Sequence, residues 1–218
     1  MSAAADVEWF ASLQQRMVDH DLRGRGIADE RVLQTMLRVP RHEFVPEGYR
    51  SHAYEDHPLP IGEGQTISQP YIVAIMLEAL ALKPTDTVLE VGTGSGYATA
   101  LLAELTARVV SVERSAMLAA GAVKTLSRLG YNNVNVVVGD GSQGFAADAP
   151  YDAILVSAAT AAVPQALLSQ LREDGGRLII PVGPAESQQL HLIRMQAGRA
   201  VLTIYGACRF VPLVPGSK

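Results

Sequence analysis

The chain has 218 residues, a length that suits one domain with a sizeable core. Apolar residues make up 48% of the sequence and charged residues 18%, which is typical of a globular protein and excludes a disordered chain. The net charge of −4 argues against general binding to nucleic acids or anionic membranes, because both attract basic proteins. We therefore expect neither as a partner.

Cysteine content and hydropathy restrict the location and the metal chemistry. Cys208 is the single cysteine, so an intrachain disulfide and a thiolate zinc cluster are excluded. His52 and His57 do not share a helical face, and we expect no metal ion. With no apolar run of about 18 residues and no basic leader, we expect neither a membrane span nor a signal peptide, and hence a cytoplasmic protein. A monomer is expected, because no surplus apolar helix face is evident.

The first predicted elements are two helices and a long irregular segment. Apolar spacing predicts a helix over Val7 to Leu22. Asp29 is expected to cap a second helix that ends near Leu37, before Pro40. From Pro40 to Ile67, prolines and glycines are mixed with apolar residues. This composition is typical of a packed functional loop.

A third helix is predicted over Gln69–Leu82, with Pro70 in its first turn. Ser68 directly precedes it, and a serine at that position commonly caps a helix. A capping role for Ser68 is compatible with a role in an active site, because one hydroxyl can turn the chain and orient a ligand.

Beyond residue 86, short apolar runs alternate with helical periodicity. Strands are expected at 87–91, 108–113, 134–138, 153–157, 177–182, 189–195 and 200–208, and helices at 96–106, 116–129 and 163–171. This alternation indicates βαβ units and a seven-stranded, mostly parallel sheet with helices on both faces. The short turn at Gly198 makes the last two strands an antiparallel pair. We expect one domain, 1–218, with an N-terminal extension (1–67) and an α/β core (68–218).

A glycine-rich loop, Glu90-Val91-Gly92-Thr93-Gly94-Ser95-Gly96-Tyr97, joins the first of these strands to its helix. Such loops let a ligand approach main-chain N–H groups closely. The dinucleotide fingerprint G-x-G-x-x-G fails, because Tyr97 and Thr99 occupy its two possible sixth positions, and no P-loop sequence occurs. Glu90 at the strand end favours a cationic ligand such as S-adenosylmethionine. The expected cofactor contacts in this loop are Glu90, Gly92, Thr93, Gly94 and Ser95.

Acids also end the next two strands. Glu113 follows Gly92 by 21 residues, about the distance at which an acid holds ribose hydroxyls in nucleotide-binding α/β folds. Asp140 ends the third strand in Gly139-Asp140-Gly141, where a carboxylate can accept from an adenine amino group and Gly141 permits close approach to the ring. Three consecutive strands that end in an acid predict an adenosine site.

The block Gly64-Gln65-Thr66-Ile67-Ser68-Gln69-Pro70-Tyr71 lies before the glycine loop, and methyltransferases in general do not share it. It is accompanied by the blocks 41–46, 89–97, 139–141, 149–152, 175–178, 180–183 and 209–213. In these blocks and in their order, the chain resembles the protein-L-isoaspartate O-methyltransferase family. Phe145 and Ser157 depart from the family's usual tryptophan and threonine.

The resemblance implies a Rossmann-like S-adenosylmethionine-dependent methyltransferase fold. It also implies methylation of the α-carboxylate of L-isoaspartyl, and possibly D-aspartyl, residues in damaged proteins, followed by spontaneous succinimide closure. S-adenosylhomocysteine would be the product, and isoaspartyl peptides and proteins the partners. By the same resemblance, Ser68 is the active-site hydroxyl, and Thr66 and Ile67 line the cofactor and substrate. Cofactor contacts would be Glu90, Gly92, Glu113, Asp140 and Gly141, and the isoaspartyl residue would be held by Leu59, Pro60, Ile61, Ser68 and Val211.

This activity needs little catalytic apparatus. A carboxylate with an ordinary pKa of about 4 is ionised at neutral pH, so no general base is required and alignment remains the protein's task. The alternatives are a small-molecule O- or N-methyltransferase on the same fold, a non-catalytic nucleotide-binding protein and a nicotinamide-dependent oxidoreductase. The Gly64–Tyr71 block disfavours the first, the three strand-end acids the second, and the failed sixth glycine the third.

Overall fold

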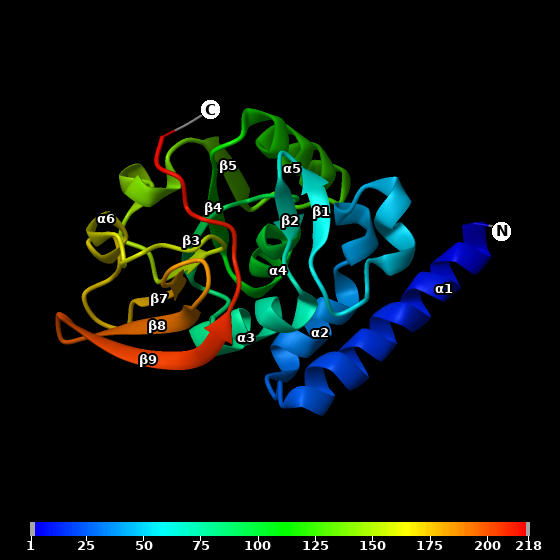
Figure 1. Ribbon diagram of the computed structural model, residues 1–218, viewed down its shortest axis with the longest axis horizontal. Helices are drawn as coiled ribbons and strands as arrows, with labels where there is room; N and C mark the ends of the chain where they lie inside the picture. The colour runs from blue at the N-terminus through cyan, green and yellow to red at the C-terminus, as the bar shows by residue number, and fades with distance from the viewer. Residues whose placement is uncertain (1–2, 217–218) are drawn as a thin grey trace.

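The computed structural model describes residues 3–216, so residues 1–2 and 217–218 of the expected domain lie outside the described residues (Figure 1). Its central sheet has the strand order β5-β4-β3-β6-β7-β8-β9. The strands are β3 (Thr87–Val91), β4 (Arg108–Glu113), β5 (Val134–Val138), β6 (Ala153–Val156), β7 (Arg177–Val182), β8 (Gln188–Gln196) and β9 (Arg199–Cys208). Strands β3 to β7 run parallel, and β8 is antiparallel to both β7 and β9. The predicted mostly parallel sheet with a C-terminal antiparallel pair is confirmed.

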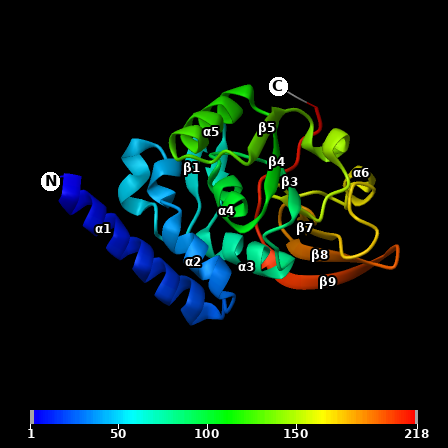
Figure 2. The same ribbon diagram turned by 180° about the vertical axis from the view of Figure 1, so that it is seen from behind.

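Helices lie on both faces of this sheet. They are α1 (Ala3–Arg16), α2 (Glu30–Arg38), α3 (Pro70–Leu80), α4 (Tyr97–Leu105), α5 (Ala116–Arg128) and α6 (Gln165–Leu168). Helices α3, α4 and α5 contribute to the larger of two apolar clusters, and α6 contributes to the smaller cluster on the opposite face. Helix α1 lies at the other end of the molecule from α6 in both views (Figures 1 and 2). Among the described residues, no helix is long and apolar enough to cross a membrane.

Two predicted helices differ from the structure in length. The first leaves α-geometry at Arg16 and continues as a π-helix over Met17–Leu22, whose wider turn lets Met17 and Leu22, five positions apart, both be buried. Helix α6 covers only four of the predicted residues, 163–171. Ser169 and Gln170 form a turn instead, and Leu171 makes a parallel bridge with Tyr151.

A small hairpin inside the predicted irregular segment was not expected. Strands β1 (Leu59–Gly62) and β2 (Gln65–Ile67) pair antiparallel. They are joined by a turn with positive φ values at Gly62, Glu63 and Gly64. The hairpin leads directly into Ser68 and α3, so it connects the N-terminal extension to the α/β core.

The start of α3 corrects the predicted cap. Gln69 is the N-cap residue and makes no capping hydrogen bond through its side chain, so Ser68 is not the cap. A distant carboxylate takes that role, because Asp56 Oδ1 accepts from the main-chain N–H of Tyr71 at 3.0 Å. The Gln69 amide also donates to Asp56 Oδ2 at 2.6 Å. The helix start is therefore fixed by tertiary contacts.

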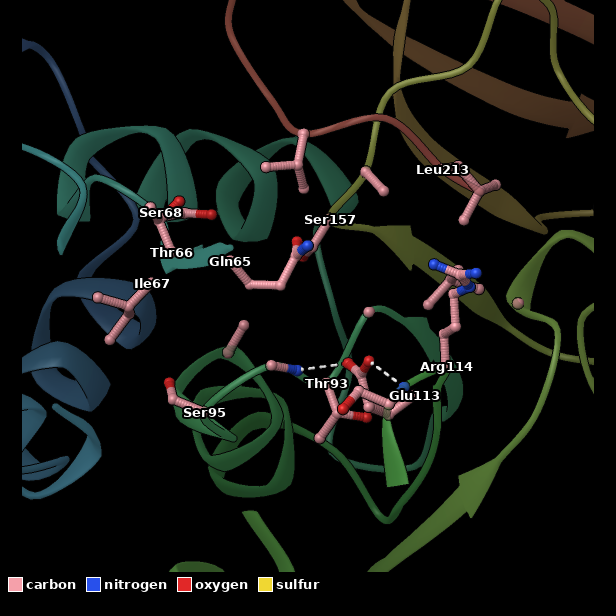
Figure 3. Close-up of a pocket in the computed structure, with 18 of the residues that line it drawn as sticks. Gln65, Thr66, Ile67, Ser68, Thr93, Ser95, Glu113, Arg114, Ser157 and Leu213 are labelled. Atoms are coloured by element: carbon pink, nitrogen blue, oxygen red, sulfur yellow. Dashed lines mark hydrogen bonds between the residues drawn. The ribbon is translucent and has the colours of Figure 1, made fainter. Parts of the chain in front are cut away.

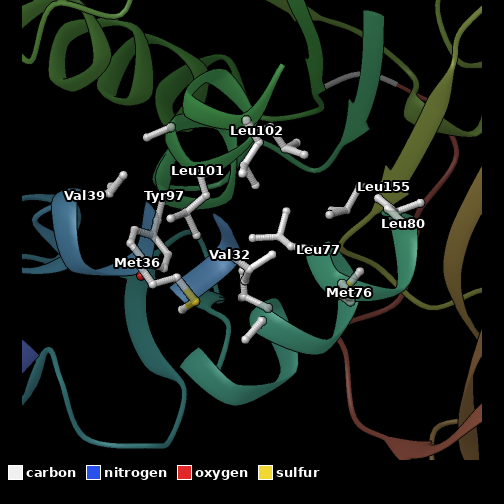
Figure 4. Packing of buried hydrophobic residues seen from close by; sticks show 14 of the residues in the cluster. Val32, Met36, Val39, Met76, Leu77, Leu80, Tyr97, Leu101, Leu102 and Leu155 are labelled. Atoms are coloured by element: carbon white, nitrogen blue, oxygen red, sulfur yellow. The ribbon is translucent and has the colours of Figure 1, made fainter. Parts of the chain in front are cut away.

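The centre of the larger apolar cluster lies where α2, α3 and α4 meet (Figure 4). Leu77 of α3 and Leu101 of α4 are both fully buried there, together with Met36 of α2. Close packing of this kind means that a missing methyl group leaves a cavity.

We predict that Leu77→Ala lowers the free energy of unfolding by about 2–5 kcal/mol, because it removes a fully buried side chain from a close-packed site. Urea denaturation of the two proteins measures the difference. Leu202→Ala on the exposed side of β9 is the matched control and should change stability by less than about 0.5 kcal/mol. Equal effects of the two substitutions would contradict the assignment of the core.

Candidate active site

One cleft opens at the carboxyl ends of the central strands (Figure 3). The chain runs from β3 through β4 to β5 on one side and returns to β6 on the other, so β3 and β6 flank the point where strand order reverses. Ligands of open α/β sheets bind at such points. The cleft has an empty volume of about 1050 Å³, counting its open mouth. Its walls are the glycine loop, the end of β2, the ends of β4 and β6, and the C-terminal segment.

The glycine loop is held in a left-handed conformation at three positions. Gly92, Gly94 and Gly96 have φ values of 93°, 55° and 90°, which L-residues with a side chain rarely adopt. The N–H of Gly92 donates to the Val112 carbonyl at 2.8 Å. Gly96 is the N-cap of α4, so the loop ends at a helix N-terminus that faces the cleft region.

Glu113 on the cleft wall ties this loop to β4. Its Oε2 accepts from the N–H of Gly94 at 2.8 Å, and its Oε1 accepts from the N–H of Ser115 at 2.9 Å (Figure 3). Each carboxylate oxygen can accept more than one hydrogen bond, so Glu113 retains acceptor capacity toward the cleft. This geometry is consistent with the predicted ribose contact.

Glu90 lies behind the wall. It pairs in register with Ser111 on β4, so both side chains lie on the face that α4 covers. Its Oε2 accepts from Ser111 Oγ and from Thr99 Oγ1, each at 2.5 Å, while no described residue bonds its buried Oε1. Ser111 Oγ is also 2.5 Å from Thr93 Oγ1, and Thr93 lines the cleft. A chain of hydrogen bonds through the hydroxyl groups of Ser111 and Thr93 therefore connects Glu90 to the cleft.

Burial raises the pKa of Glu90 to about 7, against the hydrogen bonds from Ser111 and Thr99, which lower it. The neighbouring carboxylate of Glu113 adds to the increase. A cationic ligand in the cleft would favour the ionised form of this carboxyl group and so lower its pKa.

Asp140 and Gly141 follow β5, but only Gly141 lines the cleft. The Asp140 carboxylate accepts from the N–H and hydroxyl of Ser142, at 2.9 and 2.7 Å, and from the N–H of Gly216 at 2.8 Å. A Cβ at Gly141 would lie 2.4 Å from Val91 Cγ1. Position 141 thus requires glycine for close approach of the chain to β3.

The end of β2 forms the opposite wall. Thr66, Ile67 and Ser68 all line the cleft and lie across it from Ser95 and Glu113 (Figure 3). The carbonyl of Ser68 accepts from Arg41 Nη2 at 2.8 Å, which fixes the turn between β2 and α3 from behind.

The C-terminal segment covers one side of the cleft. Ala159, after β6, donates its N–H to the Val211 carbonyl and accepts from the N–H of Leu213, both at 2.8 Å. Arg114 Nε donates to the Gly216 carbonyl at 3.1 Å. These bonds pin the segment between the ends of β4 and β6, as the path of the chain after β9 shows (Figure 1).

The structure brings most of the predicted site residues together. On the cleft wall are Thr66, Ile67, Ser68, Gly92, Thr93, Gly94, Ser95, Glu113, Gly141 and Val211. Five others do not line it, namely Glu90, Asp140, Leu59, Pro60 and Ile61. Leu59 is buried in the core and Pro60 is exposed on the hairpin. Ile61 Cδ1 lies 3.2 Å from the position of a Cβ at Gly94, so it supports the glycine loop from outside.

Several wall residues were not predicted, including Gln65, Tyr97, Arg114, Ser115, Ser157, Ala158, Leu213 and Val214. Ser157 and Ala158 directly follow β6, and the position of β6 beside β3 at the reversal of strand order is the signal that would have identified them. Within residues 3–216, no group of three or more His, Cys, Asp or Glu side chains has an arrangement that could hold a metal ion.

The mostly parallel sheet, the glycine loop after β3 and the acid at the end of β4 define a Rossmann-like S-adenosylmethionine-dependent methyltransferase. A family model described as protein-L-isoaspartate(D-aspartate) O-methyltransferase matches residues 12–218. A protein-L-isoaspartate O-methyltransferase of Koribacter versatilis is 56% identical over 214 residues, which cover 98% of this chain and 96% of the relative. One of Methanoculleus marisnigri is 55% identical over 92% of this chain and 91% of its own length. The chain belongs to the protein-L-isoaspartate(D-aspartate) O-methyltransferase family.

Solved structures agree with this assignment. A protein-L-isoaspartate O-methyltransferase superposes with a TM-score of 0.83 at 32% identity, covering 91% of this chain and 65% of that one. A Plasmodium falciparum structure, described as a putative protein-L-isoaspartate O-methyltransferase in complex with S-adenosyl-L-homocysteine, gives a TM-score of 0.80 at 28% identity. It covers 92% of this chain and 98% of that chain.

We predict that Glu90→Gln stabilises the unliganded protein at pH 8 but not at pH 5. The folded pKa of Glu90, about 7, lies above its ordinary value of 4.5, so the folded state binds the proton more tightly. Its contribution to stability is complete below pH 4.5 and is lost as the pH rises through 7, at a cost of about 3 kcal/mol. Glutamine avoids that cost because it does not ionise.

Urea denaturation of both proteins at pH 5 and pH 8 measures this effect. Glu186→Gln, which removes an exposed carboxylate, is the control and should show no comparable pH-dependent difference. A Glu90→Gln effect that is the same at both pH values would contradict the raised pKa.

Proposed function

We propose that this cleft transfers a methyl group from S-adenosylmethionine to the α-carboxylate of L-isoaspartyl residues in damaged proteins. The ester then closes to a succinimide without further help, which starts repair. One observation carries the assignment of the site: the Gln65–Ser68 segment, specific to the family, faces the glycine loop across a single cleft. D-aspartyl residues are a second acceptor to be assayed beside the first.

The cleft has the groups that an adenosine-type methyl donor requires. Glu113 offers acceptor capacity for ribose hydroxyls, and Val91, Val112, Ala158 and Leu213 supply apolar surface for a ring. We propose that Gly92, Thr93, Gly94, Ser95 and Gly141 contact the cofactor directly, together with Thr66 and Ile67. Glu90 and Asp140 would act from behind the wall. Glu90 would act through the hydrogen bonds that link it to Ser111 and Ser111 to Thr93, and Asp140 would act by fixing the position of Gly141. When bound, the sulfonium of the cofactor supplies an activated methyl group.

The chain's own residues then orient the acceptor and exclude water. An isoaspartyl carboxylate is already ionised at neutral pH, so no residue has to remove a proton. We propose that the Ser68 hydroxyl donates to this carboxylate and holds one oxygen in line for attack, since orientation supplies much of the rate in such reactions. Val211 on the C-terminal segment would close the other side.

The β1–β2 hairpin is the proposed docking element for the substrate main chain. Pro60 and Thr66 are exposed on it, beside the mouth of the cleft. Leu59 and Ile61 would act by holding the hairpin in shape, because Leu59 is buried and Ile61 supports the glycine loop. A short extended edge can bind the main chain of many substrates with little sequence preference.

The assembly and location of the protein remain predictions. We propose a monomer that acts in the cytoplasm and binds neither nucleic acids nor membranes, in keeping with its net charge of −4. Light scattering at increasing concentration tests the monomer. Self-association would point to β9, whose edge exposes Val201, Leu202, Ile204 and Tyr205.

We predict that the protein transfers labelled methyl from S-adenosylmethionine to an isoaspartyl peptide and not to the matching aspartyl peptide. The label should be released by mild base, as expected for a methyl ester, and a D-aspartyl peptide is assayed in parallel. Base-stable label, or equal labelling of the aspartyl control, would overturn the proposed function in favour of another methyl acceptor.

We predict that Ser68→Ala lowers kcat by about 10- to 100-fold, the size expected when one hydrogen bond to a charged group is lost. The free energy of unfolding should stay within about 0.5 kcal/mol, since Ser68 does not cap α3. Steady-state kinetics and urea denaturation measure the two quantities. Ser51→Ala, at an exposed position away from the cleft, is the control, and full turnover by Ser68→Ala would exclude the proposed role.

A further inference from the structure

Arg41 is a fully buried cation in the short 3₁₀ turn Arg41–Phe44. Its Nε donates to the Ala53 carbonyl at 2.7 Å, and its Nη2 donates to the Ser68 carbonyl at 2.8 Å. Its Nη1 is buried, and no described residue accepts a hydrogen bond from it. Burial lowers the pKa of Arg41, but a guanidinium remains protonated at neutral pH.

This charge has no carboxylate partner within 4.0 Å among residues 3–216. Asp56 is near enough to influence Arg41, but its carboxylate is engaged by Arg25, the Gln69 side chain and the Tyr71 N–H. An unpaired buried cation is costly, and proteins rarely keep one without use. An anion bound nearby would compensate this charge.

The neighbours of Arg41 place it directly behind the acceptor side of the cleft. Its guanidinium lies 4.8 Å from the centre of the Tyr97 ring, and Tyr97 and Ser68 both line the cleft. Burial raises the pKa of the Tyr97 hydroxyl to about 12, and the nearby Arg41 charge opposes this increase. Arg41 and the Tyr97 hydroxyl thus lie together behind the wall that holds Ser68.

Arg41 also forms one half of a clamp on the turn between β2 and α3. It holds the carbonyl of Ser68, while Asp56 holds the next side chain, that of Gln69, and the N–H of Tyr71. The main chain that carries the Ser68 side chain is therefore held from both sides before substrate enters.

We propose that Arg41 is a positioning residue that orients Ser68 through its carbonyl and supplies the positive potential that selects a carboxylate acceptor over a neutral one. This inference rests on the proposed function, because the isoaspartyl carboxylate of the substrate would be the negative charge that compensates Arg41. Lysine would keep the charge but lose the planar fork that bonds Ala53 and Ser68 together. The charge and the positioning are therefore separable by substitution.

The test compares Arg41→Met and Arg41→Lys with the wild-type chain, each saturated with S-adenosylhomocysteine. Dissociation constants are measured for an isoaspartyl peptide and for the same peptide with isoasparagine, which replaces the carboxylate by a neutral amide. The ratio of the two constants reports charge selection and is insensitive to a fraction of unfolded protein. Affinity for S-adenosylhomocysteine is the control for an intact cleft.

We expect the wild-type protein to prefer the carboxylate by about tenfold or more, because the Arg41 charge lies behind Ser68 on the acceptor side. Arg41→Met should reduce this preference at least about fivefold with unchanged affinity for S-adenosylhomocysteine. Arg41→Lys should keep the preference within about threefold but lose kcat, because Ser68 is no longer held. A merely structural Arg41 would weaken both peptides equally and leave the ratio intact, which would overturn the proposal.

A measurement on the wild-type protein covers the case in which neither variant folds. The pKa of a ¹³C-labelled isoaspartyl carboxylate, followed by NMR in the complex, should lie below that of the free peptide, and an unchanged or raised pKa would overturn the role of Arg41. Failure of the proposed function is distinguishable, because the wild-type protein would then neither bind nor methylate the isoaspartyl peptide.

Discussion

The two main-chain N–H groups that Glu113 binds hold the cleft together. One belongs to Gly94 in the loop after β3 and the other to Ser115 at the start of α5, so a single carboxylate joins two strand-to-helix connections. The left-handed glycines allow the loop to meet that carboxylate, and the parallel register of β3 and β4 brings both strand ends to one edge. This link acts together with the bond from the Gly92 N–H to the Val112 carbonyl, and the two fix the glycine loop against β4.

The strands of the core could be predicted from the sequence because their signal is local. Strands β3, β4, β5 and β7 have the predicted bounds, since each is a short, largely apolar run between turns. The β1–β2 hairpin was not predicted, because its strands have four and three residues and few of these are buried. The shorter α6 was not predicted either, because the bridge between Leu171 and Tyr151 is a tertiary contact that helical periodicity in the sequence does not reveal.

Residues of the cleft wall could be predicted where their role follows from their local position in the sequence, such as the end of a strand. Glu113 and the glycine loop follow from spacing, because the ends of adjacent parallel strands must meet. Ser68 was given a capping role from its place before α3, whereas Asp56, a dozen positions earlier, makes the capping bond. The burial of Glu90 behind Ser111 and Thr93 depends on the register of two strands and the packing of α4, which no single segment specifies.

The placement of the charges suits a reaction that destroys charge. The methyl donor is a cation and the acceptor an anion, so groups that solvate both strongly would favour the reactants over the less charged transition state. Glu90 lies one layer behind the proposed cofactor side of the cleft, and Arg41 lies one layer behind the proposed acceptor side. In the proposed reaction, charges set back in this way would attract each reactant through the intervening side chains without contacting it directly. In the proposed reaction the sulfonium becomes a thioether and the carboxylate becomes an ester, so both reacting groups lose the charge that the two buried groups would attract.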